Sequence, residues 1–413
     1  MLFNLFFSML CKALQVICGV ISIGYLVSAL GVEHYGVWVT MTSIVVWMSL
    51  FDFGVGYGVK NRLTEALVNN DQERIASLVS MIIKFYLILA IALTLIFFLL
   101  TFSLEPFSSY PDVSLLLVLC AGLSFFLSSG SMLLQALGLF RHLYLLGLLS
   151  PTIWLMFLFS AQSSELTFQM IGFVYVFLIT SQAFLIFFTA MRNFGSLHSL
   201  FKVNFPQNEF RKIVISGARF FVLQISALGL FMMGNFISYN AFGSADAAAY
   251  DTINRIYQLF NVGFSIFIQI FWVEISKAKA SGDKAKKLFC FKALIALSAI
   301  TMGVALLFAY YISDITELIS HGKVMVSSSQ AIPFFLLISA QCISYSGAVF
   351  MNAYEELKVQ VGMALFALPL FYGLLYAFIS MGMDYSAVPL ATAIALLPSM
   401  TVCLNCGYKL AKQ

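Results

Sequence analysis

Charged residues are scarce in this sequence. Lysine, arginine, aspartate and glutamate make up 10% of the 413 residues, whereas a soluble domain carries about 25%. The chain therefore cannot cover a surface that faces water, which excludes a soluble globular protein. Hydrophobic residues make up 61% of the chain, so lipid must be its main solvent. The composition predicts an all-α integral membrane protein with many crossings.

Histidines are also few, and no catalytic or metal-binding pattern is present. His34, His142, His198 and His321 fall in four separate loops and form no zinc-spaced cluster. There is no nucleophile elbow, no paired carboxylate and no extramembrane segment large enough for a catalytic domain. The pair Cys403-x-x-Cys406 lies in an apolar run without a second pair or a nearby histidine. We expect no enzymatic activity, no metal, no resident cofactor and no nucleic-acid partner.

Apolar runs long enough to cross a bilayer fill most of the chain. A hydrocarbon core of about 30 Å takes about 20 helical residues to cross. By this measure the sequence holds about twelve crossings, and the polar stretch 60–74 between the second and third is expected to be a loop. The runs are 13–30, 35–57, 75–102, 113–139, 143–161 and 167–191 in the first half, and 213–239, 247–275, 288–311, 330–353, 357–380 and 388–408 in the second.

Lysine and arginine fall almost entirely on alternate loops. If the N-terminus lies inside, the outside segments contain only Lys323 among the basic residues, while Glu33, Glu105 and Asp112 are among several acidic residues that face out. Basic loops stay on the cytoplasmic side of a membrane. The sequence therefore predicts an even number of crossings with both termini in the cytoplasm.

The two halves of the sequence resemble each other. The turn Leu30-Gly-x-Glu-x-Tyr-Gly between the first two runs has an echo in Phe242-Gly-Ser-Ala-Asp-Ala-Ala-Ala-Tyr250 between the seventh and eighth. Six crossings in each half give both halves the same orientation, as in a parallel repeat. We predict an N-terminal six-helix bundle over 1–191, a cytoplasmic linker over 192–212 and a C-terminal six-helix bundle over 213–413.

Polar residues inside the eighth run recur at helical spacing. A charge at a helix centre costs about 2.5–3.5 kcal/mol on insertion scales, so charges within a membrane usually face the protein interior. The pattern predicts either a cavity wall or a contact with another helix. The residues on this face are Asp251, Asn254, Arg255, Gln258, Asn261, Ser265 and Gln269.

The single charges each allow a second interpretation. Arg255 lies one turn from Asp251, so the two can form an ion pair within the helix. Arg219 in the seventh run and Lys84 in the third can line a cavity or extend to the membrane interface. Asp52 lies where the second run ends in a glycine-spaced segment, which favours a structural turn.

One stretch resembles a known family. Leu30-Gly-Val-Glu-His-Tyr-Gly-Val-Trp38, followed by Leu50-Phe-Asp-Phe-Gly-Val-Gly56 and Lys60-Asn-Arg62, is similar to the opening of Wzx-type O-antigen flippases. These proteins belong to the multidrug/oligosaccharidyl-lipid/polysaccharide exporter superfamily, which includes the multidrug and toxic-compound extrusion transporters. The motif covers mainly the first two crossings and the loop that follows.

The resemblance implies a function and a setting. It implies a flippase in the bacterial inner membrane that moves an undecaprenyl-pyrophosphate-linked oligosaccharide to the periplasmic leaflet, during the O-antigen stage of lipopolysaccharide biosynthesis. The implied fold is two six-helix bundles around a central cavity that rocks between inward- and outward-open states. Coupling to a proton or sodium gradient is also implied, with Asp52 and Asp251 as candidates. The O-antigen polymerase and the chain-length regulator are the implied protein partners.

These expectations assign a substrate site. Arg219, Arg255 and Lys84 are cations that could attract a pyrophosphate, and the amides of Asn254, Gln258, Asn261 and Gln269 suit sugar hydroxyls. Two other functions stay open. A drug–cation antiporter on the same fold would favour a buried carboxylate. An O-antigen polymerase would carry a large periplasmic loop, whereas the longest outside segment here, 313–329, is short.

Overall fold

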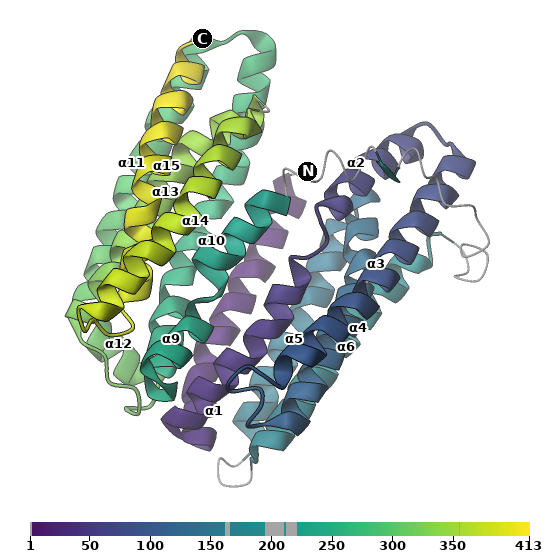
Figure 1. The fold of residues 1–413 in the computed structure, drawn as a ribbon. Helices are drawn as coiled ribbons and strands as arrows, with labels where there is room; N and C mark the ends of the chain where they lie inside the picture. The colour runs from purple at the N-terminus through teal and green to yellow at the C-terminus, as the bar shows by residue number, and fades with distance from the viewer. Residues whose placement is uncertain (1, 162–165, 195–209, 212–220, 355) are drawn as a thin grey trace. The chain divides into compact units, whose positions relative to one another are not determined.

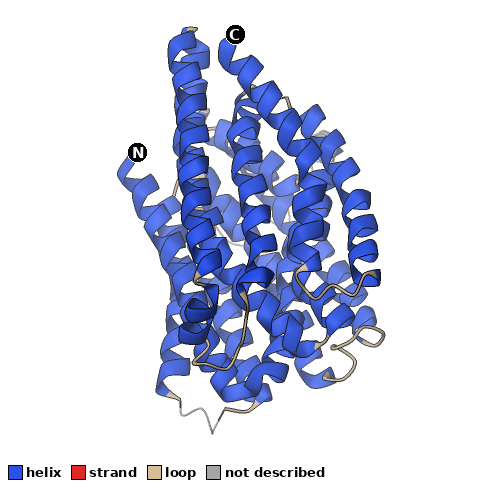
Figure 2. Ribbon diagram, turned by 90° about the vertical axis from the view of Figure 1, so that its left-hand side faces the viewer, coloured by secondary structure: helices blue, strands red, loops and turns tan. Residues whose placement is uncertain are grey.

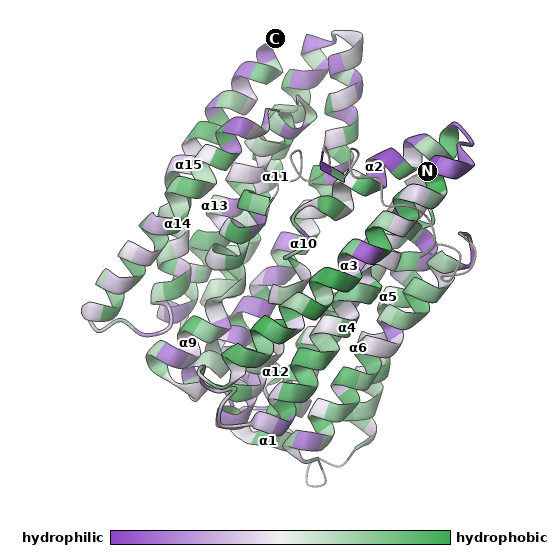
Figure 3. Cartoon of the chain, turned by 45° about the vertical axis from the view of Figure 1, so that its right-hand side comes forward, coloured by the Kyte–Doolittle hydropathy of each residue, from purple (hydrophilic) through white to green (hydrophobic). Residues whose placement is uncertain are grey.

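The chain folds entirely into helices and connections over the residues described. The computed structural model describes residues 2–161, 166–194, 210–211, 221–354 and 356–413. Within these ranges no strand is present, as Figure 2 shows. Hydrophobic residues dominate helices α3 to α6, while hydrophilic residues gather near helix ends (Figure 3). The prediction of an all-α membrane protein is confirmed.

The first helix, α1 (Leu2–Ser49), contains a break at Gly31. This residue has φ 75° and ψ 165°, outside the helical region and in a range that glycine adopts readily. A helix of 48 residues would be about 72 Å long, more than twice the hydrocarbon core. Figure 1 accordingly shows α1 as two helical stretches. Gly31 separates the first two predicted crossings.

Five further helices complete the first half of the chain. The long helix α4 begins with Pro111 at its first position, where the missing N–H costs nothing. Asp71 accepts a hydrogen bond from Arg74 N at 3.1 Å and so caps α3. The helices are α2 (Val55–Val68), α3 (Gln72–Thr101), α4 (Pro111–Ala136), α5 (Phe140–Ser160) and α6 (Phe168–Met191).

The second half begins with a bent crossing. Residues Phe221–Met232, ending in the π-helical turn η1 (Leu228–Met232), meet α9 (Gly234–Phe242) at an angle of 45°. The remaining helices are α10 (Ser244–Ser281), α11 (Lys284–Tyr310), the short α12 (Ile312–Ile319), α13 (Ser328–Ala353), α14 (Leu357–Ser380) and α15 (Ala387–Lys412).

The number of crossings agrees with the expected twelve. Ten helices in the described part are long and apolar enough to span a membrane, and the bent pair raises the count to eleven. That count takes α1 once, although its break at Gly31 divides it into two predicted crossings. Counting both stretches of α1 gives twelve.

The loop expected over 60–74 is wrong in its first part. Residues 55–68 form α2, in which Val55, Val59, Leu63 and Ala66 are fully buried. These positions lie at the spacing of one helix face, while Glu65 between them is exposed. The glycine-spaced segment is therefore the start of a helix, with Gly54 in the left-handed conformation (φ 69°) just before it.

The chain forms two compact units. The first contains residues 1–18 and 40–225, and the second contains residues 19–39 and 226–413. Thus the middle of α1 belongs to the second unit. The predicted boundary over 192–212 stays a prediction, because most of that segment lies outside the described residues.

Close helix contacts hold each unit together. In the first unit α4 packs against α6 so closely that a Cβ at Gly130 would collide with the backbone of Phe187. In the second, a Cβ at Gly407 on α15 would lie 2.7 Å from Cα of Gly347 on α13. Small residues allow such approaches between membrane helices, where dispersion contacts provide much of the attraction.

A polar contact ties the start of α13 to the connection between α14 and α15. Gln330 caps its own helix by accepting from Ser327 N at 3.0 Å, and its amide donates to Asp384 Oδ2 at 2.7 Å. Ser386 N also donates to Asp384, at 3.0 Å. Burial raises the pKa of Asp384, but the hydrogen bonds from Ser386 and Gln330 outweigh it, so this pKa lies below its ordinary value.

Candidate functional site

Asp251 is the centre of a buried polar cluster in the second unit. This residue of α10 is 3% exposed. The hydroxyl of Tyr35 on α1 donates to Oδ2 at 2.6 Å, and the amide of Asn235 on α9 donates to Oδ1 at 3.0 Å. Helices α1, α9 and α10 therefore meet at one carboxylate. A buried charge is tolerated only when its oxygens are satisfied in this way.

Arg255 balances the charge of Asp251. Its Nε donates to Asp251 Oδ2 at 2.6 Å, one turn along the same helix. The ion pair within the helix, one of the two interpretations of this arginine, is thus formed. The side chain of Arg255 is 34% exposed, whereas that of Asp251 is 5% exposed. Asp251 holds the guanidinium in place without burying it.

Glycines let the surrounding helices approach this cluster. A Cβ at Gly36 on α1 would collide with the carbonyl of Ser244, at the start of α10. A Cβ at Gly234 on α9 would collide with the hydroxyl of Tyr250. Arg255 Nη1 also lies 3.6 Å from the position that a Cβ would take at Gly19. Gly36 and Gly234 thus allow α1 and α9 to pack closely against α10.

The predicted amides continue the polar face of α10 beyond the cluster. Asn254, Gln258 and Asn261 are half-buried, and Gln269 is exposed. The residues of an adjoining face of the helix, Ile253, Ile256, Tyr257 and Phe264, are buried in the second unit. Within the described part of the chain, none of the four amides is hydrogen-bonded to another residue. A row of amides without internal partners can bind hydroxyl groups of a ligand.

Of the other two predicted cations, the structure describes one. Lys84 is a half-buried residue of α3 in the first unit. Arg219 lies outside the described residues. The structure therefore joins Asp251 with Arg255 and places the four amides on the same helix. The assignment of all these residues to a substrate cavity stays a prediction.

A second buried carboxylate, Asp52, lies in the first unit between α1 and α2. This residue is 3% exposed. Its oxygens accept hydrogen bonds from Gly54 N at 3.0 Å and Gly56 N at 3.3 Å, which satisfy the first N–H groups of α2. The hydroxyl of Tyr86 donates at 3.0 Å and the amide of Gln224 at 2.9 Å. These contacts confirm the structural turn expected at Asp52.

Four partners of the two carboxylates were not anticipated. Asn235 carried a usable signal, because it is an amide inside the run 213–239, as did Gln224. Tyr35 and Tyr86 carried none, since a tyrosine in an apolar run is ordinary. In the described part of the chain, no three His, Cys, Asp or Glu residues are placed to hold a metal ion.

The comparisons with known proteins begin with sequence. No protein-family model matches this chain. A protein of Salmonella typhimurium with the description "Putative O-antigen transporter" is 43% identical over 49 residues. That match covers 12% of this chain and 11% of the length of the Salmonella protein.

Solved structures resemble the whole chain. An inward-facing multidrug resistance MATE family transporter of the MOP superfamily matches with a TM-score of 0.76 and 15% identity, over 96% of this chain and 94% of that one. An outward-facing MATE family transporter matches with a TM-score of 0.69 and 14% identity, over 98% and 94%. A MOP superfamily transporter from Pyrococcus furiosus matches with a TM-score of 0.62 and 14% identity, over 100% and 95%. This multi-pass membrane protein therefore has the fold of the MATE transporters.

Proposed function

We propose that this protein is a transporter that flips a lipid-linked, anionic oligosaccharide across the bacterial inner membrane. The substrate we propose is the undecaprenyl-pyrophosphate-linked O-antigen unit of lipopolysaccharide biosynthesis. The fold supports transport by alternating access, the motif over 30–62 supports the flippase family, and the local match to the Salmonella protein supports the O-antigen.

The observation that carries this proposal is the position of Arg255. A cation inside a membrane helix is costly, and here Asp251 holds it while a third of its side chain stays exposed. An arginine with a fixed guanidinium is well suited to bind phosphate oxygens. The amides of Asn254, Gln258 and Asn261 lie on the same side of the helix, where they suit sugar hydroxyls.

Complementation of a strain that lacks its O-antigen flippase tests the role of Arg255. We expect Arg255→Ala to lower O-antigen export by about tenfold or more, because one desolvated phosphate contact is worth about 1.5–3 kcal/mol. Arg255→Lys should keep partial export, since lysine retains the charge but not the planar fork. Lys277→Ala, which removes one exposed positive charge from the same helix, is the matched control and should export normally.

A double variant separates function from folding. Arg255→Ala alone leaves the buried carboxylate of Asp251 without its counter-charge, which can lower protein levels. Asp251→Asn combined with Arg255→Ala restores neutrality and should restore the protein level but not export. Normal export by this double variant at normal protein level would refute the proposal.

A drug–cation exporter is the second candidate function. The solved structures that share the fold include multidrug resistance transporters. An exporter of cations would give cells that carry this protein resistance to cationic dyes, and the resistance would be lost in Asp251→Asn. Export of cationic dyes without any effect on O-antigen would favour this function.

We further propose that Asp52 couples transport to a proton or sodium gradient. In the described part of the chain the carboxylate of Asp52 meets only neutral donors, whereas that of Asp251 is balanced by Arg255. Asp52→Asn should therefore make export insensitive to collapse of the gradient.

The O-antigen polymerase and the chain-length regulator are the protein partners we propose. Co-purification of either protein from cross-linked cells tests this.

A further inference from the structure

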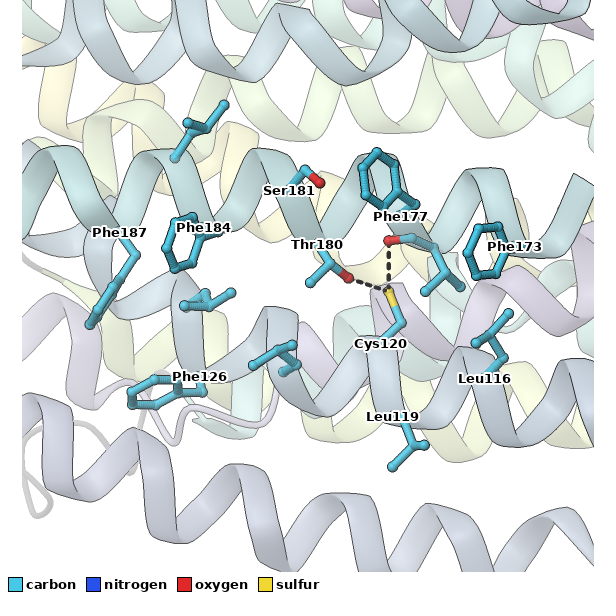
Figure 4. Close-up of a pocket in the computed structure, with 14 residues that line it drawn as sticks. Leu116, Leu119, Cys120, Phe126, Phe173, Phe177, Thr180, Ser181, Phe184 and Phe187 are labelled. Carbon is cyan, nitrogen blue, oxygen red and sulfur yellow. Dashed lines mark hydrogen bonds between the residues drawn. The ribbon is translucent and has the colours of Figure 1, made fainter.

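An apolar groove of about 890 Å3 lies between α4 and α6 in the first unit (Figure 4). Its walls are mostly leucine and phenylalanine side chains from both helices, and the few polar side chains are Cys120, Thr180 and Ser181. The hydroxyl of Thr180 donates to the sulfur of Cys120 at 3.3 Å, so two of these three satisfy each other. Such a lining favours a hydrocarbon chain over water or an ion.

The groove follows the direction of the crossing. Its lining runs from Leu116 to Leu127 along α4, a rise of about 16 Å or half of the hydrocarbon core. On α6 it runs from Phe173 to Phe187. The groove closes toward the C-terminal ends of both helices, where Gly130 meets the backbone of Phe187. A lipid chain that lies along the bilayer normal has the matching direction.

A positively charged side chain lies just beyond this end of the groove. Phe184 lies at the exposed edge of the groove and stacks with Phe188, with ring centroids 6.1 Å apart. The guanidinium carbon of Arg192 lies 4.7 Å from the centroid of Phe188. The three side chains continue along one face of α6 to the end that the distribution of basic residues assigns to the cytoplasm. An anionic headgroup on a chain in the groove would reach Arg192.

We propose that this groove binds the polyprenyl tail of a phosphorylated isoprenoid lipid, with Arg192 at its phosphate. This inference rests on the proposed function, in which the substrate's head crosses while its tail stays in the bilayer. Five phenylalanines line the groove, at positions 126, 173, 177, 184 and 187. Their ring faces suit the double bonds and methyl branches of an isoprenoid chain. A groove along the crossing would guide the tail while the head moves.

Photo-crosslinking of the full-length protein tests this site. The protein is placed in vesicles of phosphatidylethanolamine and phosphatidylglycerol that contain a polyprenyl phosphate with a photoreactive group on its tail. We expect mass spectrometry to find adducts on α4 and α6, and unlabelled polyprenyl phosphate to compete for them. Ser181→Trp or Leu119→Trp, which fill the groove from opposite walls, should lower labelling about tenfold. Ile91→Trp on the exposed face of α3 is the matched control and should change nothing.

Two results would overturn the inference. Equal competition by added phosphatidylglycerol would show a general site for acyl chains, and adducts confined to other helices would show that the tail binds elsewhere. Arg192→Ala should lower labelling by the phosphate but not by a polyprenol that lacks it; equal loss of both would refute the role of Arg192. If the groove is labelled but the protein does not support O-antigen export, the proposed function is rejected and the assignment of the groove stands.

Discussion

The hydroxyl of Tyr35 lies 2.6 Å from the carboxylate of Asp251, although 216 residues separate them in sequence. The contact joins the second crossing to the eighth, and both residues are buried. The oxygen that Tyr35 approaches is the one that also holds Arg255. The orientation of the candidate phosphate-binding arginine therefore depends on a residue of α1 that is more than 200 positions away in sequence.

Removal of the Tyr35 hydroxyl should lower the free energy of unfolding less than removal of the Asp251 carboxylate. Tyr35→Phe leaves Asp251 with one donor fewer, which costs roughly 1–2 kcal/mol. Asp251→Ala removes the carboxylate that forms the ion pair with Arg255 and should cost more, up to about 3 kcal/mol. Thermal melting in detergent measures both. Tyr310→Phe, at an exposed tyrosine, is the control and should melt as the natural protein does; the reverse order of the two variants would contradict this account.

Gly56 should not tolerate a side chain. A Cβ there would lie 2.6 Å from the hydroxyl of Tyr86 and 2.8 Å from Oδ2 of Asp52. Gly56→Ala should therefore lower the free energy of unfolding by roughly 1–3 kcal/mol. Gly303→Ala is the matched control, because a Cβ there meets no atom within 4 Å and alanine favours the helix. The same melting assay measures both variants.

A second substitution tests the cause of that loss. Tyr86→Phe removes the hydroxyl that the new Cβ would meet first, so it should recover part of the stability of Gly56→Ala. If the double variant were less stable than the natural protein by the full sum of the two single losses, the proposed clash would be wrong.

The hydrophobic pattern predicted the crossings well and the α2 helix poorly. Apolar runs of the right length are a local signal. Helix α2 is short, and Gly54, Gly56 and Gly58 at its start do not favour a helix. Its buried positions at 55, 59, 63 and 66 nevertheless have helical spacing, so the signal was there. The polar face of α10 was likewise readable, but the partners of Asp251 come from distant helices. No spacing within α10 could have identified Tyr35 or Asn235.

The bond between Gln330 and Asp384 should stabilise the protein in a pH-dependent way. The pKa of Asp384 is lowered in the folded protein, so its contribution is present above the unfolded value of about 3.9 and is lost as pH falls through the lower folded value. Asp384→Asn should lose roughly 1 kcal/mol near neutral pH. Melting temperatures from neutral pH to pH 3 measure this, and a difference that grows below pH 4 would contradict it.

The direction of the chain in the membrane can be tested by fusions. The distribution of basic residues predicts that both termini lie in the cytoplasm. A fluorescent protein fused after Gln413 should therefore fluoresce. Alkaline phosphatase fused after Lys323 should be active, and the same enzyme fused after Gly282 should be inactive. Activity in the opposite pattern would invert the topology and move Arg192 to the periplasmic side.

The cluster around Asp251 also constrains how this sequence can diverge. A charge pair with donors from three helices has few viable intermediates, since loss of one member leaves another buried without its partner. Homologues should therefore keep Asp251 and Arg255 together or replace both at once. Position 36 should stay glycine wherever Ser244 keeps its close backbone approach. Substitutions at positions 35 and 251, more than 200 positions apart, should then be correlated among homologues because both residues bond through one carboxylate.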